Sequence, residues 1–162
     1  MNTRLFSRLL ETESALAPLA LRIPVGIIFA AHGSQKLFGL FGGYGLEGTG
    51  QWMASIGLRP GELFALLGGS AEFFGGLALL LGLLVRPASI LLAFTMLVAI
   101  FSVHITKGLF LDKGGLEYAL ALFAVSISLL FSGAGAFSLD RVLGGANADP
   151  KRRGAFGRAL SV

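Results

Sequence analysis

Four long apolar stretches occupy most of this chain and leave little else from which a fold can be built. A membrane-spanning helix needs about 20 mainly apolar residues to cross a hydrocarbon core roughly 30 Å thick. Residues 16–38, 63–85, 88–106 and 116–137 each have about that length and few formal charges. The mean hydropathy of +0.79 is well above what the core of a water-soluble domain requires. We therefore expect an all-α, polytopic membrane protein. Its four transmembrane helices should form an antiparallel bundle.

The connections between these stretches are short, with one exception. Arg86-Pro87 separates the second stretch from the third, and proline disfavours helix at the residue before it, so a tight antiparallel hairpin is expected there. A polar, glycine-rich turn at 107–115 joins the third to the fourth. The longest connection, 39–59, includes a segment that Thr49 can cap as a helix. We expect this segment to be a short interfacial helix on the membrane surface.

The two ends of the chain flank the membrane domain, residues 16–140. Residues 1–15 are expected to form an amphipathic cytoplasmic segment, which is retained because the apolar run after it is too long for a cleaved secretory signal. Residues 141–162 form a basic cytoplasmic tail, which is more typical of contact with anionic lipid head groups than with nucleic acid.

The distribution of basic residues predicts the orientation of the bundle. With both termini in the cytoplasm, most of the Lys and Arg residues fall on the inner side, as the positive-inside rule requires. These are Arg4, Arg8, Arg22, Arg86, Arg141, Lys151, Arg152, Arg153 and Arg158. We therefore predict a multi-pass protein of the cell inner (cytoplasmic) membrane with both termini cytoplasmic.

The chain contains no cysteine. This excludes disulfides, thiolate metal ligands, iron–sulfur ligation and any thiol-based redox step carried by this chain alone. The sequence also lacks a phosphate-binding loop and a glycine-rich dinucleotide fingerprint after a strand. Soluble nucleotide cofactors are therefore not expected.

Polar side chains recur in the half of the membrane domain that faces away from the cytoplasm. They are His32, Gln35 and Lys36 in the first stretch, Glu72 in the second, His104 and Lys107 in the third, and Glu117 in the fourth. Charged groups inside a membrane are costly, and they usually pair with one another or mark a functional site. We predict that these side chains converge into one polar pocket toward the outer leaflet.

Glu72 is the strongest individual signal in this set. Its neighbours three and four residues away are glycines, which allow another helix to approach closely. These glycines are Gly68, Gly69, Gly75 and Gly76. Glu72 is therefore expected to face protein, not lipid.

Two other charged residues can be placed by their surroundings. Glu117 is also expected to face protein, because small residues continue its face at helical spacing, namely Ala121, Ala124 and Ser128. Arg22 lies nearer the inner end of the first stretch, where snorkelling or a structural pair is the favoured role.

Several motifs together resemble those of one protein family. They are Ala31-His32-Gly33-Ser34-Gln35-Lys36-Leu37-Phe38-Gly39, Glu72-Phe73-Phe74-Gly75-Gly76, Arg86-Pro87-Ala88, His104 and Glu117. In order and spacing they resemble the DoxX family, over about residues 16–140. The resemblance implies a four-helix membrane protein of a family named after a subunit of an archaeal thiosulfate:quinone oxidoreductase. Its members are described as parts of membrane redox complexes or as accessory proteins in oxidative-stress and metal-linked pathways, and this chain has no recognisable thiosulfate site.

The leading functional interpretation is a quinone-linked redox subunit that acts with a partner redox protein. A quinone head group needs hydrogen bonds at two oxygens and a group that exchanges protons. The candidate catalytic residues are Glu72, His32, His104 and Glu117, and the candidate substrate-binding residues are Lys36, Gln35 and Lys107. Whether the chain has enzymatic activity of its own is left open.

Other interpretations remain at this point. One is a non-enzymatic accessory or assembly protein whose glycine-lined helices dock a partner or a second copy of the chain. Another is a proton or small-solute path, although the inner halves of the helices offer little polar lining. A haem held by His32 and His104, or a divalent metal held by these two with Glu72 and Glu117, is chemically admissible but less favoured.

Overall fold

Residues 16–146 are described by the computed structural model of this chain, and they are almost entirely helical, with no strand among them. The expected amphipathic segment 1–15 lies outside the described residues. So does most of the expected basic tail, from residue 147 onward.

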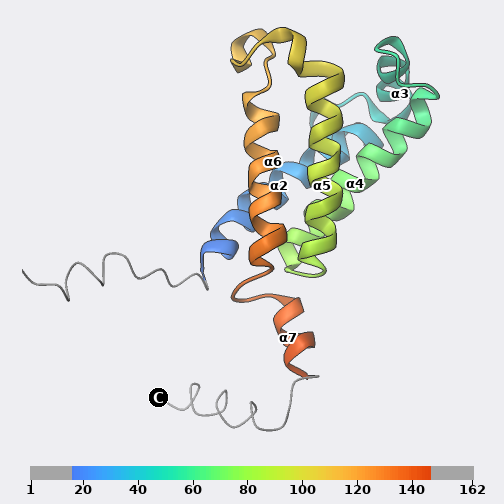
Figure 1. Cartoon of the computed structure of the whole chain (residues 1–162). Helices are drawn as coiled ribbons and strands as arrows, with labels where there is room; N and C mark the ends of the chain where they lie inside the picture. Colours follow the sequence, from blue (N-terminus) through green and yellow to red (C-terminus); the bar gives the residue numbers. More distant parts are fainter. Residues whose placement is uncertain (1–15, 147–162) are drawn as a thin grey trace, which may run out of the picture.

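Four apolar helices confirm the predicted fold class. They are α2 (Ala17–Phe38), α4 (Gly61–Leu81), α5 (Val85–Ala99) and α6 (Glu117–Ser132). Helices α2 and α4 are long and apolar enough to cross a membrane, as is α5 with its continuation to Lys107, while α6 is apolar but shorter, at 16 residues. Successive helices run in opposite directions, with α2 inclined beside α4 and α5 beside α6 (Figure 1). The chain is a membrane protein.

The four helices pack around an apolar core. Phe29 of α2, Leu79 of α4, Leu92 of α5 and Leu129 of α6 are each at most 1% exposed. Lipid tails are as apolar as these side chains, so removal from lipid gives little driving force for association. Close packing between the helices must therefore supply much of the stability of the bundle.

Helices α2 and α4 approach so closely that only glycine fits at their contact. A Cβ atom added to Gly33 would lie 2.3 Å from the backbone nitrogen of Phe73, and one added to Gly76 would lie 2.4 Å from that of Ala30. This confirms that the glycines beside Glu72 admit another helix, and it identifies that helix as α2. Among the other predicted glycines, Gly69 also faces α2, Gly75 faces Leu92 of α5, and Gly68 has open space around it.

The turn between α4 and α5 lies earlier in the chain than expected. Gly82 ends α4 in the left-handed region, at φ +65°, and α5 begins at Val85. Arg86 and Pro87 therefore belong to the first turn of α5 and do not separate the helices. Proline is well tolerated in a first turn, where its missing N–H has no intrahelical partner to lose.

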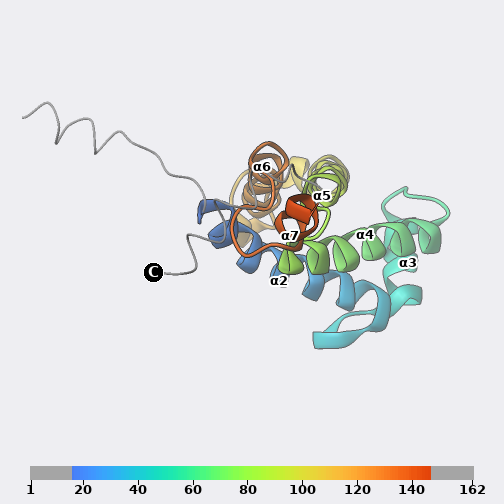
Figure 2. The same cartoon turned by 90° about the horizontal axis from the view of Figure 1, so that it is seen from below.

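The end of α6 also differs from the expected span, which continued to residue 137. Gly133 adopts φ +75° and leaves the helix after Ser132. Residues 134–138 form a loop that leads into a further short helix, α7 (Leu139–Ala146). Figures 1 and 2 show α7 at the end of the bundle where α4 meets α5.

Arg22 joins α2 to the end of α4 and to the loop after α6 through hydrogen bonds to main-chain carbonyl groups. It is 1% exposed. Its Nη1 atom donates to the carbonyl oxygens of Leu79 and Leu80, at 2.8 and 2.9 Å, where α4 ends. Its Nη2 atom donates to the carbonyl oxygens of Ala136 and Phe137 in the loop after α6. Arg22 therefore does not snorkel to the surface, and its contacts are structural, but they are made to carbonyl groups and not to the paired side chain that was expected.

The opposite end of the bundle carries the remaining short helices. Helix α2 is followed by η1 (Leu40–Gly42) and α3 (Gly45–Ser55), and α5 continues as a π-helical turn, η2 (Ile100–His104), and a 3₁₀ turn, η3 (Ile105–Lys107). A further 3₁₀ turn, η4 (Leu111–Lys113), precedes α6. The predicted short helix is thus present as α3, but it begins before Thr49, which is buried within it and does not cap it. Its position on the membrane surface stays a prediction.

Candidate functional site in the membrane domain

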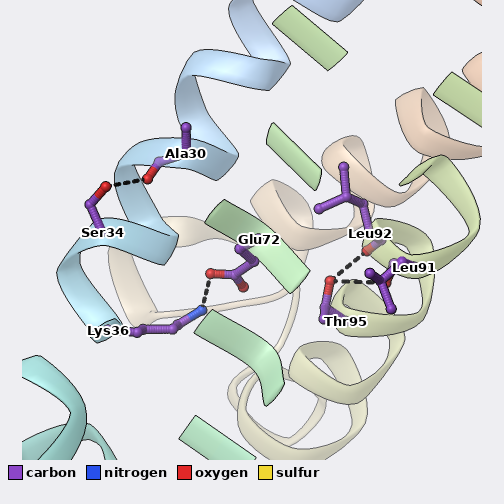
Figure 3. A network of polar contacts seen from close by, with 7 residues as sticks. All are labelled: Ala30, Ser34, Lys36, Glu72, Leu91, Leu92 and Thr95. Carbon is purple, nitrogen blue, oxygen red and sulfur yellow. Dashed lines mark hydrogen bonds and ion pairs between the residues drawn. The ribbon is translucent and has the colours of Figure 1, made fainter. Parts of the chain in front are cut away.

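An ion pair between α2 and α4 forms the centre of the candidate site. Glu72 is only 3% exposed, so the prediction that it faces protein is confirmed. The Nζ atom of Lys36 donates a hydrogen bond to its Oε2 atom (Figure 3). Within residues 16–146 this is the one salt bridge. The glycine contact holds α2 against α4, so the lysine side chain can reach across to the carboxylate.

Two hydroxyl groups near this pair are bound to the backbone of their own helices. Ser34 Oγ donates to the carbonyl oxygen of Ala30 at 2.7 Å, and Thr95 Oγ1 donates to that of Leu92 at 2.8 Å (Figure 3). Neither hydroxyl is recorded in a hydrogen bond to Glu72. Lys36 therefore supplies the one side-chain hydrogen bond to this carboxylate in the described part of the chain.

A cavity of about 130 Å³ lies against the ion pair, and four separate helical segments contribute its walls. Its polar or ionisable lining residues are His32 and Lys36 from α2, Glu72 from α4, His104 from η2 and Tyr118 from α6. Its apolar lining residues are Phe29, Met96, Ala99, Ala119 and Leu122. The structure thus brings together four of the polar residues selected from the sequence and adds Tyr118.

His104 is held in the cavity wall by the π-helical turn and by the following loop. Its Nδ1 atom lies 2.7 Å from the carbonyl oxygen of Gly114. A carbonyl oxygen can only accept, so Nδ1 must carry the proton in this contact. In the neutral ring, Nε2 then has a free lone pair and can accept a hydrogen bond or a proton. Single π-helical turns within α-helices occur frequently at functional sites.

Three of the selected residues do not line this cavity. Glu117 accepts a hydrogen bond from the backbone nitrogen of Leu111 at 2.6 Å, and Gln35 Nε2 donates to the carbonyl oxygen of Phe41 at 3.2 Å. Lys107 is exposed beside the loop that contains Gly114. Lys107 follows His104 in the 3₁₀ turn η3 and is not among the residues that line the cavity.

The expectation that the face of Glu117 packs against protein is wrong. The small residues that continue this face, Ala121, Ala124 and Ser128, are exposed. The buried positions of α6 are Ala119, Leu122, Ser126 and Leu129. The small side chains on the face of Glu117 therefore did not mark the contact face of α6. Leucines on the other face fill the space between α5 and α6.

Tyr118 was not selected from the sequence. It is 39% exposed at the edge of the cavity, and its ring centroid lies 6.2 Å from that of His32. The sequence signal for Tyr118 was a repeat at spacings of three and four, formed by Ala119, Leu122 and Ser126. This repeat places residue 118 beside the buried face of α6. His32 is exposed as well, so the cavity reaches the protein surface between α2 and α6.

The residues present fit neither the haem nor the metal alternative. A volume of about 130 Å³ is well below the roughly 300–1,000 Å³ of ordinary small-molecule sites, and a haem does not fit such a space. No three His, Asp or Glu side chains gather into a potential metal site among residues 16–146. The metal set considered from the sequence included Glu117, which is bound to Leu111 instead.

The family assignment rests on a match that covers more than half of the chain. The DoxX family model matches residues 17–105, which include α2, α4, α5 and the cavity residues up to His104. The chain belongs to the DoxX family. No solved structure gives a significant match.

Three proteins illustrate the relatives of this DoxX-family chain. A Bacillus subtilis (strain 168) protein named "Putative oxidoreductase CatD" is 34% identical over 125 residues, which cover 77% of this chain and 85% of that protein. An uncharacterized membrane protein of Mycobacterium tuberculosis is 34% identical over 150 residues, with 84% and 86% covered. An uncharacterized protein of Haemophilus influenzae is 33% identical over 127 residues, with 74% and 85% covered.

Proposed function

We propose that this DoxX-family protein is a membrane subunit of an oxidoreductase and binds the head group of a quinone or quinol in the cavity beside Glu72. The observation that carries the proposal is the convergence of Glu72, His104 and His32, from three separate helical segments, on one small cavity. The oxidoreductase name of the similar Bacillus subtilis protein agrees with this class of activity.

The size of the cavity suits a single ring. A cavity of roughly 150 Å³ in an apolar protein core is known to hold benzene, and the cavity here is about 130 Å³. Phe29, Met96 and Leu122 supply apolar walls for such a ring. The opening beside His32 and Tyr118 would let an attached hydrocarbon tail remain in the lipid.

The polar groups suit proton transfer from a quinol. Oxidation of a quinol to a quinone releases two protons and two electrons. Glu72 accepts one proton on its carboxylate and His104 accepts the other on Nε2, while Lys36 donates a hydrogen bond to a substrate oxygen. The electrons pass to a partner redox protein, because this chain has no cysteine to ligate a cluster or exchange electrons through a thiol.

Replacing Glu72 by glutamine tests this proposal. Glu72→Gln keeps the shape of the side chain but removes the proton acceptor, and hydrogen bonds to charged groups contribute about 1.5–3 kcal/mol. We expect the affinity for a short-tailed ubiquinol analogue to fall at least about tenfold. The measurement is a binding titration of the full chain in uncharged detergent, together with extraction and quantification of quinone that copurifies with native lipid.

The matched control is Glu62→Gln, which removes an exposed carboxylate from the first turn of the same helix. It should leave quinol binding unchanged. If neither wild-type protein nor Glu62→Gln binds quinone or quinol, the proposal is incorrect. Equal affinity in wild-type protein and a folded Glu72→Gln variant would instead assign the Lys36–Glu72 pair a structural role.

The contacts of the glycines bear on the accessory-protein alternative. The residues that a partner would have used, Gly33 and Gly76 above all, are already occupied by the packing of α2 on α4. A solute path is also poorly supported, since Phe29, Leu79 and Leu92 belong to the apolar core of the bundle and are almost fully buried. Both observations favour a ligand site with an opening on one side over a docking surface or a channel.

The orientation proposed for the bundle is that both termini are cytoplasmic, in an inner membrane. Arg22, Arg86 and Arg141 lie at the end of the bundle formed by the α4–α5 turn and the loop after α6. The segments that precede α2 and follow α7 in the sequence carry six further Lys and Arg residues, which brings the proposed cytoplasmic side to nine of the thirteen, as the positive-inside rule requires. The proposed quinone cavity then lies toward the opposite leaflet.

A further inference from the structure

A second and larger cavity lies at the end of the bundle that holds these arginines. Its volume is about 380 Å³, and it is bounded by the start of α5, the loop after α6 and the start of α7. Its lining residues include Leu84, Arg86, Asp140 and Arg141. None of them belongs to the proposed quinone site.

The charges around this cavity leave a positive excess. Arg86 and Arg141 are exposed and form no salt bridge within the described part of the chain. The single carboxylate in the wall, that of Asp140, accepts hydrogen bonds from the backbone nitrogens of Leu84 and Val85 at 2.7 and 3.0 Å. It is therefore committed to holding α7 against the start of α5, and both guanidinium groups remain available to an anion.

The donor groups in the cavity wall match the chemistry of a phosphate. Arginine presents a planar set of N–H donors that fits phosphate oxygens in pairs. Arg86 makes one long hydrogen bond, 3.4 Å, to the carbonyl oxygen of Phe131, which leaves most of its donors without a partner among residues 16–146.

Exposed apolar side chains surround the cavity and place it at a lipid surface. They are Leu84, Phe131, Phe137, Leu139, Val142 and Leu143, each at least 40% exposed. In a membrane protein such side chains are in contact with acyl chains, whereas a site for a water-soluble anion has no need of them. Charged groups at the edge of an apolar surface are positioned for lipid head groups.

We propose that this cavity binds the phosphate of an anionic phospholipid, with Arg86 and Arg141 holding the head group and the surrounding apolar side chains contacting its acyl chains. The site is independent of the proposed quinone cavity and lies within residues 84–141, so that Arg141 is its one residue from the basic tail. Its occupation would attach the loop after α6 and the start of α7 to the head-group layer.

The test compares lipid affinities of the full chain in uncharged detergent, using phosphatidylglycerol and phosphatidylcholine as probes. Each arginine near an anionic lipid is worth about a fivefold change in binding. We expect phosphatidylglycerol to bind more tightly than phosphatidylcholine, and the Arg86→Gln/Arg141→Gln variant to lose roughly 30-fold in affinity for phosphatidylglycerol. The Arg86→Lys/Arg141→Lys variant should have an intermediate affinity, because the charges remain but the paired N–H donors are lost.

The matched control is Arg59→Gln/Lys113→Gln, which removes the same net charge from exposed positions outside this cavity. An equal loss of affinity in this control would overturn the proposal by showing that only net charge matters. Inorganic phosphate is the second probe. If it displaces the lipid with comparable affinity, the site belongs to a soluble phosphate and the lipid assignment is incorrect. Thermal unfolding of each variant establishes that the compared proteins are folded.

Discussion

Gly33→Ala is expected to lower the free energy of unfolding by at least about 2–3 kcal/mol, although alanine is ordinarily the better helix former by about 1 kcal/mol. The added Cβ would lie 2.3 Å from the backbone nitrogen of Phe73 and 2.7 Å from the carbonyl oxygen of Gly69. Both are backbone atoms, which cannot rotate away as a side chain can. Helix α2 must therefore move away from α4. The close packing between the two helices is then lost, and in lipid this packing is a main source of stability because hydrophobic association is weak.

The matched control for this substitution is Gly68→Ala. Gly68 lies in the interior of α4, and the one atom near its added Cβ would be the terminal methyl of Met53 at 3.9 Å. This variant should be neutral or more stable by up to about 1 kcal/mol, because the helix gains alanine without a clash. The measurement is equilibrium unfolding in mixed detergent micelles. Equal stability of the two variants would contradict the close contact between α2 and α4.

Arg22→Met should have an effect of similar size at the other end of the bundle. Methionine keeps much of the apolar volume but removes every donor. The carbonyl groups of Leu80, Ala136 and Phe137 then lose their bond to Arg22, and that of Leu79 keeps only its bond from the N–H of Gly82. Hydrogen bonds from a charged donor contribute roughly 1.5–3 kcal/mol each, and water at the bundle end can replace some of them. We expect a loss of about 3–5 kcal/mol in the same unfolding measurement.

Two further variants separate the hydrogen bonds of Arg22 from its charge. Arg22→Lys keeps the charge, but one ammonium group cannot serve carbonyl groups on both α4 and the loop after α6, so we expect an intermediate loss. Arg59→Met removes an exposed arginine with a single long bond, 3.5 Å to the carbonyl oxygen of Ala54, and should change stability by less than about 1 kcal/mol. A stability of Arg22→Met like that of Arg59→Met would refute the anchoring role.

Residues whose environment is set locally could be placed from the sequence. Glu72 lies between glycine pairs on one helix, so its burial and the approach of a second helix followed from helical spacing alone. His32 and Lys36 share a face of α2 for the same reason, and both line the cavity. The identity of the approaching helix did not follow, because any of the other helices can supply a close neighbour.

Residues near helix ends could not be placed in the same way. Glu117 and Gln35 bind backbone groups of adjoining loops, and the course of those loops depends on contacts between distant segments. No composition signal announced the π-helical turn at Ile100–His104, which carries His104. Tyr118 became visible as a cavity residue when the packed face of α6 was known.

Apolar length, glycine spacing and a few costly charges were enough to predict from the sequence a four-helix membrane bundle with a buried acid on its second span. These properties are local, since each depends on residues within a few turns of one helix. The cavity beside Glu72, the anchoring of α4 by Arg22 and the arginine-lined cavity near α7 were decided only by the tertiary structure. Each joins backbone or side-chain groups that are far apart in the chain, and helix packing alone determines which of them meet.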